Sequence, residues 1–139
     1  MNADMRVAMW VSLCVLLLLA LPLKAQEVLT PEQAFRPSAR YIDAKTIEVR
    51  YDITPGHYLY RHKFAFTAPV EAKLGTPAIP RGKLMQDEIF GKVETYRDSV
   101  RIRIPASGSE FFMQATSQGC ADIGLCYPPI TQSLSLKRP

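Results

Sequence analysis

The stretch TIEVRYDI, residues 46–53, alternates between apolar and polar side chains along its whole length. Its apolar members are Ile47, Val49, Tyr51 and Ile53. Successive side chains of a β-strand point to opposite faces, so this pattern predicts a strand that buries one face and exposes the other. The dipeptide Pro55-Gly56 follows directly and predicts a turn.

The sequence on both sides of this strand carries further strand signals. After the turn, residues 57–67 alternate again and predict a second strand with one aromatic-rich face. That face comprises Tyr58, Tyr60, His62, Phe64 and Phe66. Residues 100–104 alternate between aliphatic and arginine side chains and predict another strand. Residues 70–74, 111–117 and 130–136 have strand-like composition, whereas residues 26–40 show no clear period and are expected to form an extended arm.

Length and composition narrow the fold further. The chain has 139 residues, enough for one domain, and its 47% hydrophobic and 22% charged residues exclude a wholly disordered, collagen-like or multi-span membrane protein. Its 11 prolines recur too often for long helices. Roughly seven short strands therefore predict an all-β, immunoglobulin-like antiparallel β-sandwich over residues 26–139.

Residues 1–25 are predicted to be a secretory signal peptide outside this fold. Arg6 places a positive charge near the start, residues 7–23 are almost wholly apolar, and Ala25 supplies a small residue for cleavage. An uncleaved membrane anchor is the alternative, although the apolar run is shorter than the roughly 20 residues of a spanning helix. In both cases the domain is expected to be exported.

The charge balance of residues 26–139 is mild. They hold 15 basic and 12 acidic residues, a formal net charge of +3, and the basic residues are scattered along the sequence. A nucleic-acid partner is therefore not expected.

Three cysteines occur in the chain, and Cys14 lies in the leader, which leaves Cys120 and Cys126 as a pair. Five residues separate them within GCADIGLCYPP, residues 119–129. A bridge over so short a loop stabilises a fold by only about 2–2.5 kcal/mol, against about 4–5 kcal/mol for a loop of a hundred residues. Because a local bridge also lies where a partner thiol can reach it, the spacing leaves a structural disulfide and a redox-active pair equally open.

A metal site is a third interpretation of the cysteine pair, with His57 and His62 as further ligands. The spacing matches no common zinc motif, which disfavours this site. His62 shares its parity with the aromatic residues around it and is expected to be a packed strand residue.

Four stretches of the chain resemble the N-terminal domain of the DsbD family of bacterial thiol:disulfide interchange proteins. They are GHYLYRHKF at 56–64, DEIFGKVETYRD at 87–98, the cysteine segment at 119–129 and, more weakly, TPEQAF at 30–35. With the strands between them they cover nearly all of residues 26–139 in the family's order. The resemblance implies an immunoglobulin-like sandwich, a periplasmic location and thiol–disulfide exchange through the cysteine pair.

The resemblance also implies roles for the cysteines and their surroundings. Cys126 is expected to form mixed disulfides with partners, and Cys120 is expected to resolve them. The surrounding residues are Asp87, Glu88, Ile89, Phe90 and Gly91 of a cap loop, together with Tyr58 and Tyr60. A carboxylate beside a thiol disfavours the thiolate, so the two acidic residues are expected to keep the reduced cysteines protonated and unreactive. The family usually has an aromatic residue where this chain has Ile89, which is expected to cover the sulfurs less completely.

The same residues have simpler interpretations when the resemblance is set aside. Asp87 and Glu88 fit an acidic turn that faces solvent. Tyr58 and Tyr60 fit an aromatic stripe that faces the core.

The resemblance implies partners as well. Family members accept two electrons from a membrane-embedded partner through a thioredoxin-like domain. They pass them to periplasmic disulfide isomerases or to the thioredoxin-like proteins of cytochrome c maturation. The implied activity is that of a protein-disulfide reductase with no cofactor besides the cysteine pair.

The chain ends at Pro139, so a free-standing version of the domain is expected, with its electron donor on another polypeptide. A periplasmic binding or adaptor module with a purely structural disulfide is the alternative function.

Overall fold

The computed structural model describes residues 3–7, 10 and 27–139. The predicted signal peptide lies largely outside the described residues. Within the described part of the chain, no helix is long and apolar enough to cross a membrane.

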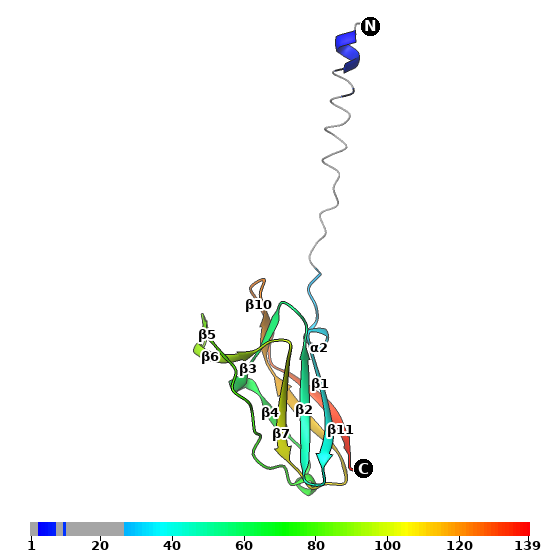
Figure 1. Ribbon diagram of the computed structural model, residues 1–139, viewed down its shortest axis with the longest axis vertical. Helices are drawn as coiled ribbons and strands as arrows, with labels where there is room; N and C mark the ends of the chain where they lie inside the picture. The colour runs from blue at the N-terminus through cyan, green and yellow to red at the C-terminus, as the bar shows by residue number, and fades with distance from the viewer. Residues whose placement is uncertain (1–2, 8–9, 11–26) are drawn as a thin grey trace.

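The described domain consists almost entirely of short strands (Figure 1). Its elements are α2 (Pro31–Ala34), β1 (Phe35–Asp43), β2 (Thr46–Ile53), β3 (His57–Tyr60), η1 (Arg61–Lys63), β4 (Ala65–Thr67), η2 (Val70–Ala72), β5 (Lys83–Asp87), β6 (Gly91–Tyr96), β7 (Ser99–Pro105), β8 (Glu110–Ser117), β9 (Gly119–Ala121), β10 (Leu125–Cys126) and β11 (Ile130–Lys137). The elements η1 and η2 are single 3₁₀ turns.

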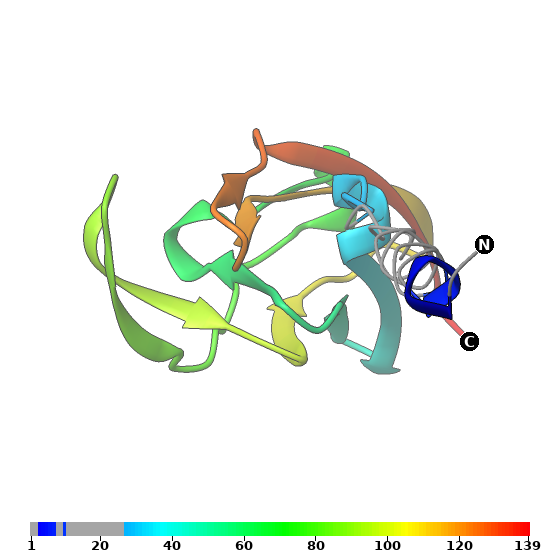
Figure 2. The same cartoon turned by 90° about the horizontal axis from the view of Figure 1, so that it is seen from above.

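Three antiparallel sheets make up the domain. Their strand orders are β1-β2-β7, β11-β8-β4 and β10-β9-β3-β6-β5. Seen from above, the first two lie on opposite sides of the domain, and the β5–β6 hairpin projects away from both (Figure 2). The turn that precedes β10 and the start of β1 lie at the same end of the molecule (Figure 1). The prediction of an all-β antiparallel sandwich is confirmed.

The core lies where the predicted apolar faces meet. Every apolar side chain of the opening stretch is buried, including Val49 and Tyr51, which are fully inaccessible. Ile102 of β7, predicted from the alternating run at residues 100–104, is fully buried as well. Met113 of β8 and Leu136 of β11 close the core from the facing sheet. Strand alternation predicted the buried faces of β2 and β7, whereas β8 and β11 were predicted from their strand-like composition.

The prediction of one strand over residues 57–67 was wrong. The structure divides it into β3, the η1 turn and β4, because β3 pairs with β6 and β9 whereas β4 pairs with β8 in a different sheet. Leu59 and Tyr60 are both buried although they point to opposite faces of β3. His62 lies in the turn and is exposed, so its expected place in a packed strand was also wrong.

Two other segments differ from the sequence predictions. Residues 70–74 contain the η2 turn (Val70–Ala72) rather than a strand, since Pro69 precedes the turn and Lys73 ends it with a φ of 46°. The expected extended arm is short, because Thr30 and Gln33 form a capping box that starts α2, and β1 begins directly after it.

Candidate functional site

The two cysteines are joined by a disulfide between paired strands. Cys120 of β9 and Cys126 of β10 are directly opposite in the antiparallel register, with an S–S distance of 2.12 Å. The intervening turn contains Gly124 with a φ of 90°, a conformation that favours glycine. The backbone amide of Asp122 in this turn donates to the carbonyl of Gly56, which fixes the turn against β3.

The two cysteine residues differ in their exposure to solvent. Cys120 is 1% exposed, whereas Cys126 belongs to the exposed residues. Cys126 lines a groove of about 460 Å³ together with residues of the β5–β6 hairpin and of the β9–β10 turn. A reagent or a partner protein can therefore reach Cys126 while Cys120 stays covered.

The hydroxyl of Tyr60 lies between Cys120 and a buried carboxylate. The hydroxyl of Tyr60 lies 3.1 Å from Sγ of Cys120 and donates to Oδ2 of Asp87 at 2.5 Å. The other carboxylate oxygen, Oδ1, accepts from the backbone amides of Ile89 at 2.8 Å and Phe90 at 2.9 Å. Asp87 thus both anchors the tip of the hairpin and fixes the tyrosine beside the sulfur.

The protonation states of these groups follow from their contacts. Burial alone would raise the pKa of the Asp87 carboxyl, but the hydrogen bond from Tyr60, followed by those from the two backbone amides, lowers it below its ordinary value. Burial and then the hydrogen bond to Asp87 raise the pKa of Tyr60 well above its ordinary value. At neutral pH the tyrosine is therefore the donor and the aspartate the charged acceptor.

Aromatic side chains surround Tyr60. Phe90 meets it edge to face with ring centroids 5.1 Å apart, and Tyr58 does so at 5.6 Å. Phe90 also packs against His62 at 4.9 Å, and Nζ of Lys63 lies 4.6 Å above its ring. The aromatic cluster belongs to a second, smaller core that includes Cys120.

The predicted cap loop is the tip of the β5–β6 hairpin. Phe90 packs into the smaller core, whereas Ile89 is 70% exposed. Glu88 is exposed and lines the groove beside Cys126, and Gly91 begins β6 with a φ of 73°. In this structure the loop therefore covers Tyr60 and leaves Cys126 open.

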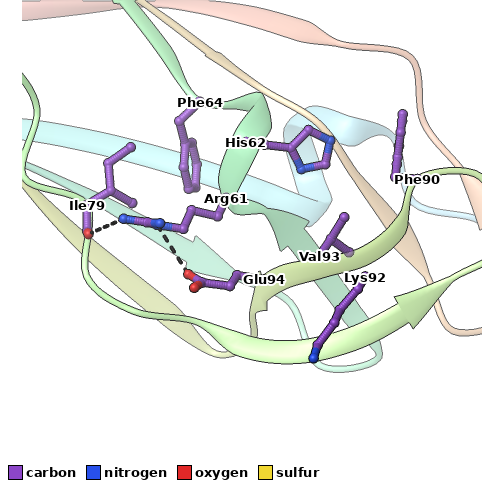
Figure 3. A pocket seen from close by; sticks show the side chains of 8 residues that line it. All are labelled: Arg61, His62, Phe64, Ile79, Phe90, Lys92, Val93 and Glu94. Atoms are coloured by element: carbon purple, nitrogen blue, oxygen red, sulfur yellow. Dashed lines mark hydrogen bonds and ion pairs between the residues drawn. The ribbon is translucent and has the colours of Figure 1, made fainter.

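Phe90 also lines a separate pocket of about 700 Å³ (Figure 3). Figure 3 shows Phe90 and His62 at one end and the Arg61–Glu94 ion pair at the other. Phe90 is thus shared between this pocket and the cluster around Cys120.

The roles assigned by resemblance did not include an arginine that holds the disulfide turn. Arg97 at the end of β6 makes two hydrogen bonds to Asp122, of 2.8 and 3.0 Å. Its guanidinium lies 5.1 Å from the ring centroid of Tyr58. The sequence contained a signal, since both charged residues lie inside stretches that carry the resemblance, but nothing in their spacing paired them.

The histidines do not join the cysteines in a metal site. His57 stacks on Tyr127, and His62 packs on Phe90. Among the described residues no group of three or more His, Cys, Asp and Glu side chains is arranged to hold a metal ion.

Fold and site together define a small β-sandwich domain that presents a disulfide with one accessible cysteine. The family model described as "Thiol:disulfide interchange protein DsbD, N-terminal" matches residues 25–138. The chain belongs to this family, and the resemblance seen in its sequence is confirmed.

Curated relatives agree with this assignment. The chain is 46% identical over 117 residues to the thiol:disulfide interchange protein DsbD of Ralstonia nicotianae, a match that covers 81% of this chain and 19% of the relative. It is 40% identical over 109 residues to DsbD 1 of Pseudomonas aeruginosa, covering 76% and 18%. The chain therefore spans about a fifth of the length of these relatives.

Solved structures show the same fold. The reduced N-terminal domain of Neisseria meningitidis DsbD superposes with a TM-score of 0.72 at 30% identity, covering 80% of this chain and 90% of that one. The complex between the DsbD and PilB N-terminal domains of the same organism gives a TM-score of 0.67 at 30% identity, covering 83% and 91%. The prediction of an immunoglobulin-like sandwich is confirmed.

Proposed function

We propose that this domain is a thiol–disulfide oxidoreductase that exchanges electrons with other proteins through Cys126. The unequal exposure of the two cysteine residues carries the proposal, because Cys120 is 1% exposed whereas Cys126 is exposed and lines a groove. A purely structural bridge has no need of an accessible sulfur. A bridge over so short a loop also contributes little stability, about 2–2.5 kcal/mol.

The exchange proceeds in two balanced steps. The thiolate of reduced Cys126 attacks a partner disulfide, forms a mixed disulfide and releases one partner thiolate, which takes up a proton. Cys120 then loses its proton and attacks Sγ of Cys126, which re-forms the internal disulfide and releases the second partner thiolate. Two electrons pass to the partner, and the reverse sequence recharges the domain from a donor.

The surroundings of Cys120 support its role as the resolving cysteine. The ionised carboxylate of Asp87 reaches it through the hydroxyl of Tyr60 and disfavours a second negative charge there. Cys120 therefore remains a thiol until a mixed disulfide forms beside it. Glu88 is exposed and lines the same groove as Cys126, so its carboxylate adds a further negative charge to that groove.

The partners are proposed from the family alone. A thioredoxin-like donor linked to a membrane transporter would reduce the domain in the periplasm. Periplasmic disulfide isomerases or thioredoxin-like proteins of cytochrome c maturation would then oxidise it, so the domain would act as a protein-disulfide reductase. The exported state rests on the leader sequence.

A trapping experiment tests this function. Cys120→Ser leaves Cys126 unable to resolve its adducts, so mixed disulfides with donor and acceptor proteins should accumulate in periplasmic extract and disappear on reduction. Cys126→Ser is the matched control and should trap nothing, because its remaining thiol is buried. A disulfide that stays oxidised in strongly reducing glutathione, together with no trapped adducts in Cys120→Ser, would favour the adaptor alternative. Equal trapping by both variants would contradict the assignment of Cys126 as the attacking cysteine.

A further inference from the structure

The outer face of the β1-β2-β7 sheet carries an ordered array of arginines. In the antiparallel register Arg40 pairs with Glu48, which pairs with Arg103. One row along, Arg50 pairs with Arg101. Residues that pair directly across neighbouring strands share one face of a sheet. We call this surface the arginine face; its charged residues are Arg36, Arg40, Arg50, Arg101, Arg103, Glu48 and Asp52.

This face accounts for the entire net charge of the domain. Five arginines and two carboxylates give it a formal charge of +3, the same value as for all of residues 26–139. The rest of the domain is therefore neutral in sum. Basic residues that are scattered along the sequence are brought together by the strand pairing.

The carboxylate at the centre leaves the guanidinium donors only partly occupied. The side chain of Glu48 is 7% exposed and lies 3.5 Å from Arg40, 3.7 Å from Arg101 and 3.9 Å from Arg103. The two longer contacts exceed hydrogen-bond length, so those N–H groups can still donate to another acceptor. A hollow of about 290 Å³ beside Ser38 is lined by three of the arginines.

The chemistry of the face fits phosphate groups better than a protein surface. Protein interfaces have an apolar or aromatic centre, but the large exposed hydrophobic residues of the described chain lie outside β1, β2 and β7. The cationic residues of these strands are all arginine, whose planar fork binds phosphate through two parallel hydrogen bonds. A flat array of phosphates matches a flat array of guanidinium groups.

We propose that the arginine face binds the phosphate headgroups of an anionic phospholipid surface. The sheet then lies on the membrane with the opposite sheet, β11-β8-β4, facing away (Figure 2). The disulfide belongs to the third sheet, so Cys126 stays accessible to protein partners beside the membrane.

Vesicle sedimentation tests the proposal on residues 27–139, the counterpart of a neisserial domain that crystallised on its own. Each uncompensated arginine near an anionic surface contributes roughly a fivefold increase in affinity. The domain should therefore bind phosphatidylglycerol vesicles about a hundredfold more tightly than phosphatidylcholine vesicles, and salt should weaken the binding. Arg101→Gln with Arg103→Gln should abolish most of this preference.

Two further variants distinguish binding by the arginine face from a general effect of net charge and from a loss of folding. Arg81→Gln with Lys83→Gln removes the same charge from exposed positions outside the arginine face and should leave most of the binding intact. Glu48→Gln raises the charge of the face and should strengthen binding about fivefold. All variants should keep the wild-type rate of disulfide exchange with glutathione.

Several results would overturn the proposal. They are an equal loss of binding in both double variants, no preference for phosphatidylglycerol at low salt, and weaker binding by Glu48→Gln. Saturable binding of inorganic phosphate or of polyglutamate to the arginine face, without vesicle binding, would assign the face to a soluble anion or to an acidic protein instead.

Discussion

The hydroxyl of Tyr60 lies 3.1 Å from Sγ of Cys120, and the same hydroxyl donates to the carboxylate of Asp87. One side chain thus couples a buried sulfur to a buried charge. The arrangement gives a strictly local way to alter the sulfur's electrostatic surroundings without touching either cysteine.

Tyr60→Phe removes this link and keeps the aromatic packing. Asp87 then loses one of its three hydrogen-bond donors while it stays buried, so we expect the oxidised domain to lose roughly 1–3 kcal/mol of unfolding free energy. Urea denaturation measures this loss. Tyr60→Phe should also change the rate of glutathione exchange. Tyr96→Phe, which removes a hydroxyl bonded to the carbonyl of Pro80, is the control and should leave that rate unchanged. Equal changes in exchange for both variants would contradict the coupling.

Asp87→Asn tests the charge itself through the pH dependence of stability. The pKa of Asp87 in the folded protein lies below its ordinary value of 3.8. The ionised carboxylate therefore contributes stability that is fully present above that value and is lost as the pH falls through the folded-state pKa. The wild type should lose more unfolding free energy than the variant between pH 5 and about pH 2. Parallel stability curves in urea at each pH would refute this role.

Removal of the carboxylate should also favour the thiolate forms of the reduced cysteines. We expect the alkylation of reduced Asp87→Asn by iodoacetamide to reach its plateau at lower pH than that of the wild type. Glu94→Gln, which removes a carboxylate paired with Arg61, is the control and should follow the wild-type profile. An unshifted profile for Asp87→Asn would show that the carboxylate does not influence the sulfurs.

The strands predicted from alternation were those that bury one face, such as residues 46–53 and 100–104. Alternation failed at β3, because Leu59 faces the main core while Tyr60 faces the smaller core around Cys120. No polarity pattern marks a strand that is buried on both faces. The β5–β6 hairpin is recognisable in the sequence only through the resemblance, since its exposed side chains obscure any alternation of polar and apolar residues.

The site, like the fold, could be predicted from the sequence only in part. The cysteine pair was recognisable from its spacing and flanking residues, but spacing alone left a structural and a redox bridge equally open. The difference in exposure between Cys120 and Cys126 is the observation on which the proposed exchange function rests, and it depends on strand pairing and on packing against Tyr60. The Arg97–Asp122 pair joins residues 25 positions apart, which no local motif could reveal.

Phe90 and Ile89 should differ in their effect on the site. Phe90→Ala removes the ring that packs on Tyr60. Because Phe90 is only partly buried, we expect the unfolding free energy to fall by less than the roughly 3–5 kcal/mol typical of a fully buried phenylalanine. We also expect dithiothreitol to reduce the disulfide faster. Ile89→Ala is the matched control at a side chain that is 70% exposed, and should change both quantities little. If the disulfide were reduced faster in Ile89→Ala but not in Phe90→Ala, the side chain that protects the disulfide would be Ile89 and not Phe90.

The Arg97–Asp122 pair should hold the disulfide turn in place after reduction. Loss of this bidentate ion pair lowers the effective concentration of one thiol near the other. Arg97→Gln should therefore shift the glutathione equilibrium toward the reduced form by up to about fivefold, the upper end of the range for an exposed ion pair. Asp122→Asn should act alike, and the two changes together should add nothing further. A fully additive double variant would show that the contact does not act on the cysteines.

Gly119 shows how little space lies behind the cysteines. A Cβ built at this position would lie 2.0 Å from the carbonyl oxygen of Tyr58 and 2.8 Å from Cζ of Phe35, so the β3–β9 pairing would have to open. We therefore expect Gly119→Ala to cost at least 3 kcal/mol of unfolding free energy, about the upper range for overpacking. Gly124→Ala is the control, since its Cβ meets nothing within 4 Å and only the φ of 90° is unfavourable, at roughly 1–2 kcal/mol. Equal midpoints in urea for the two variants would mean that β9 can move away from β3 without loss, contrary to the packing that holds Cys120 beside Tyr60.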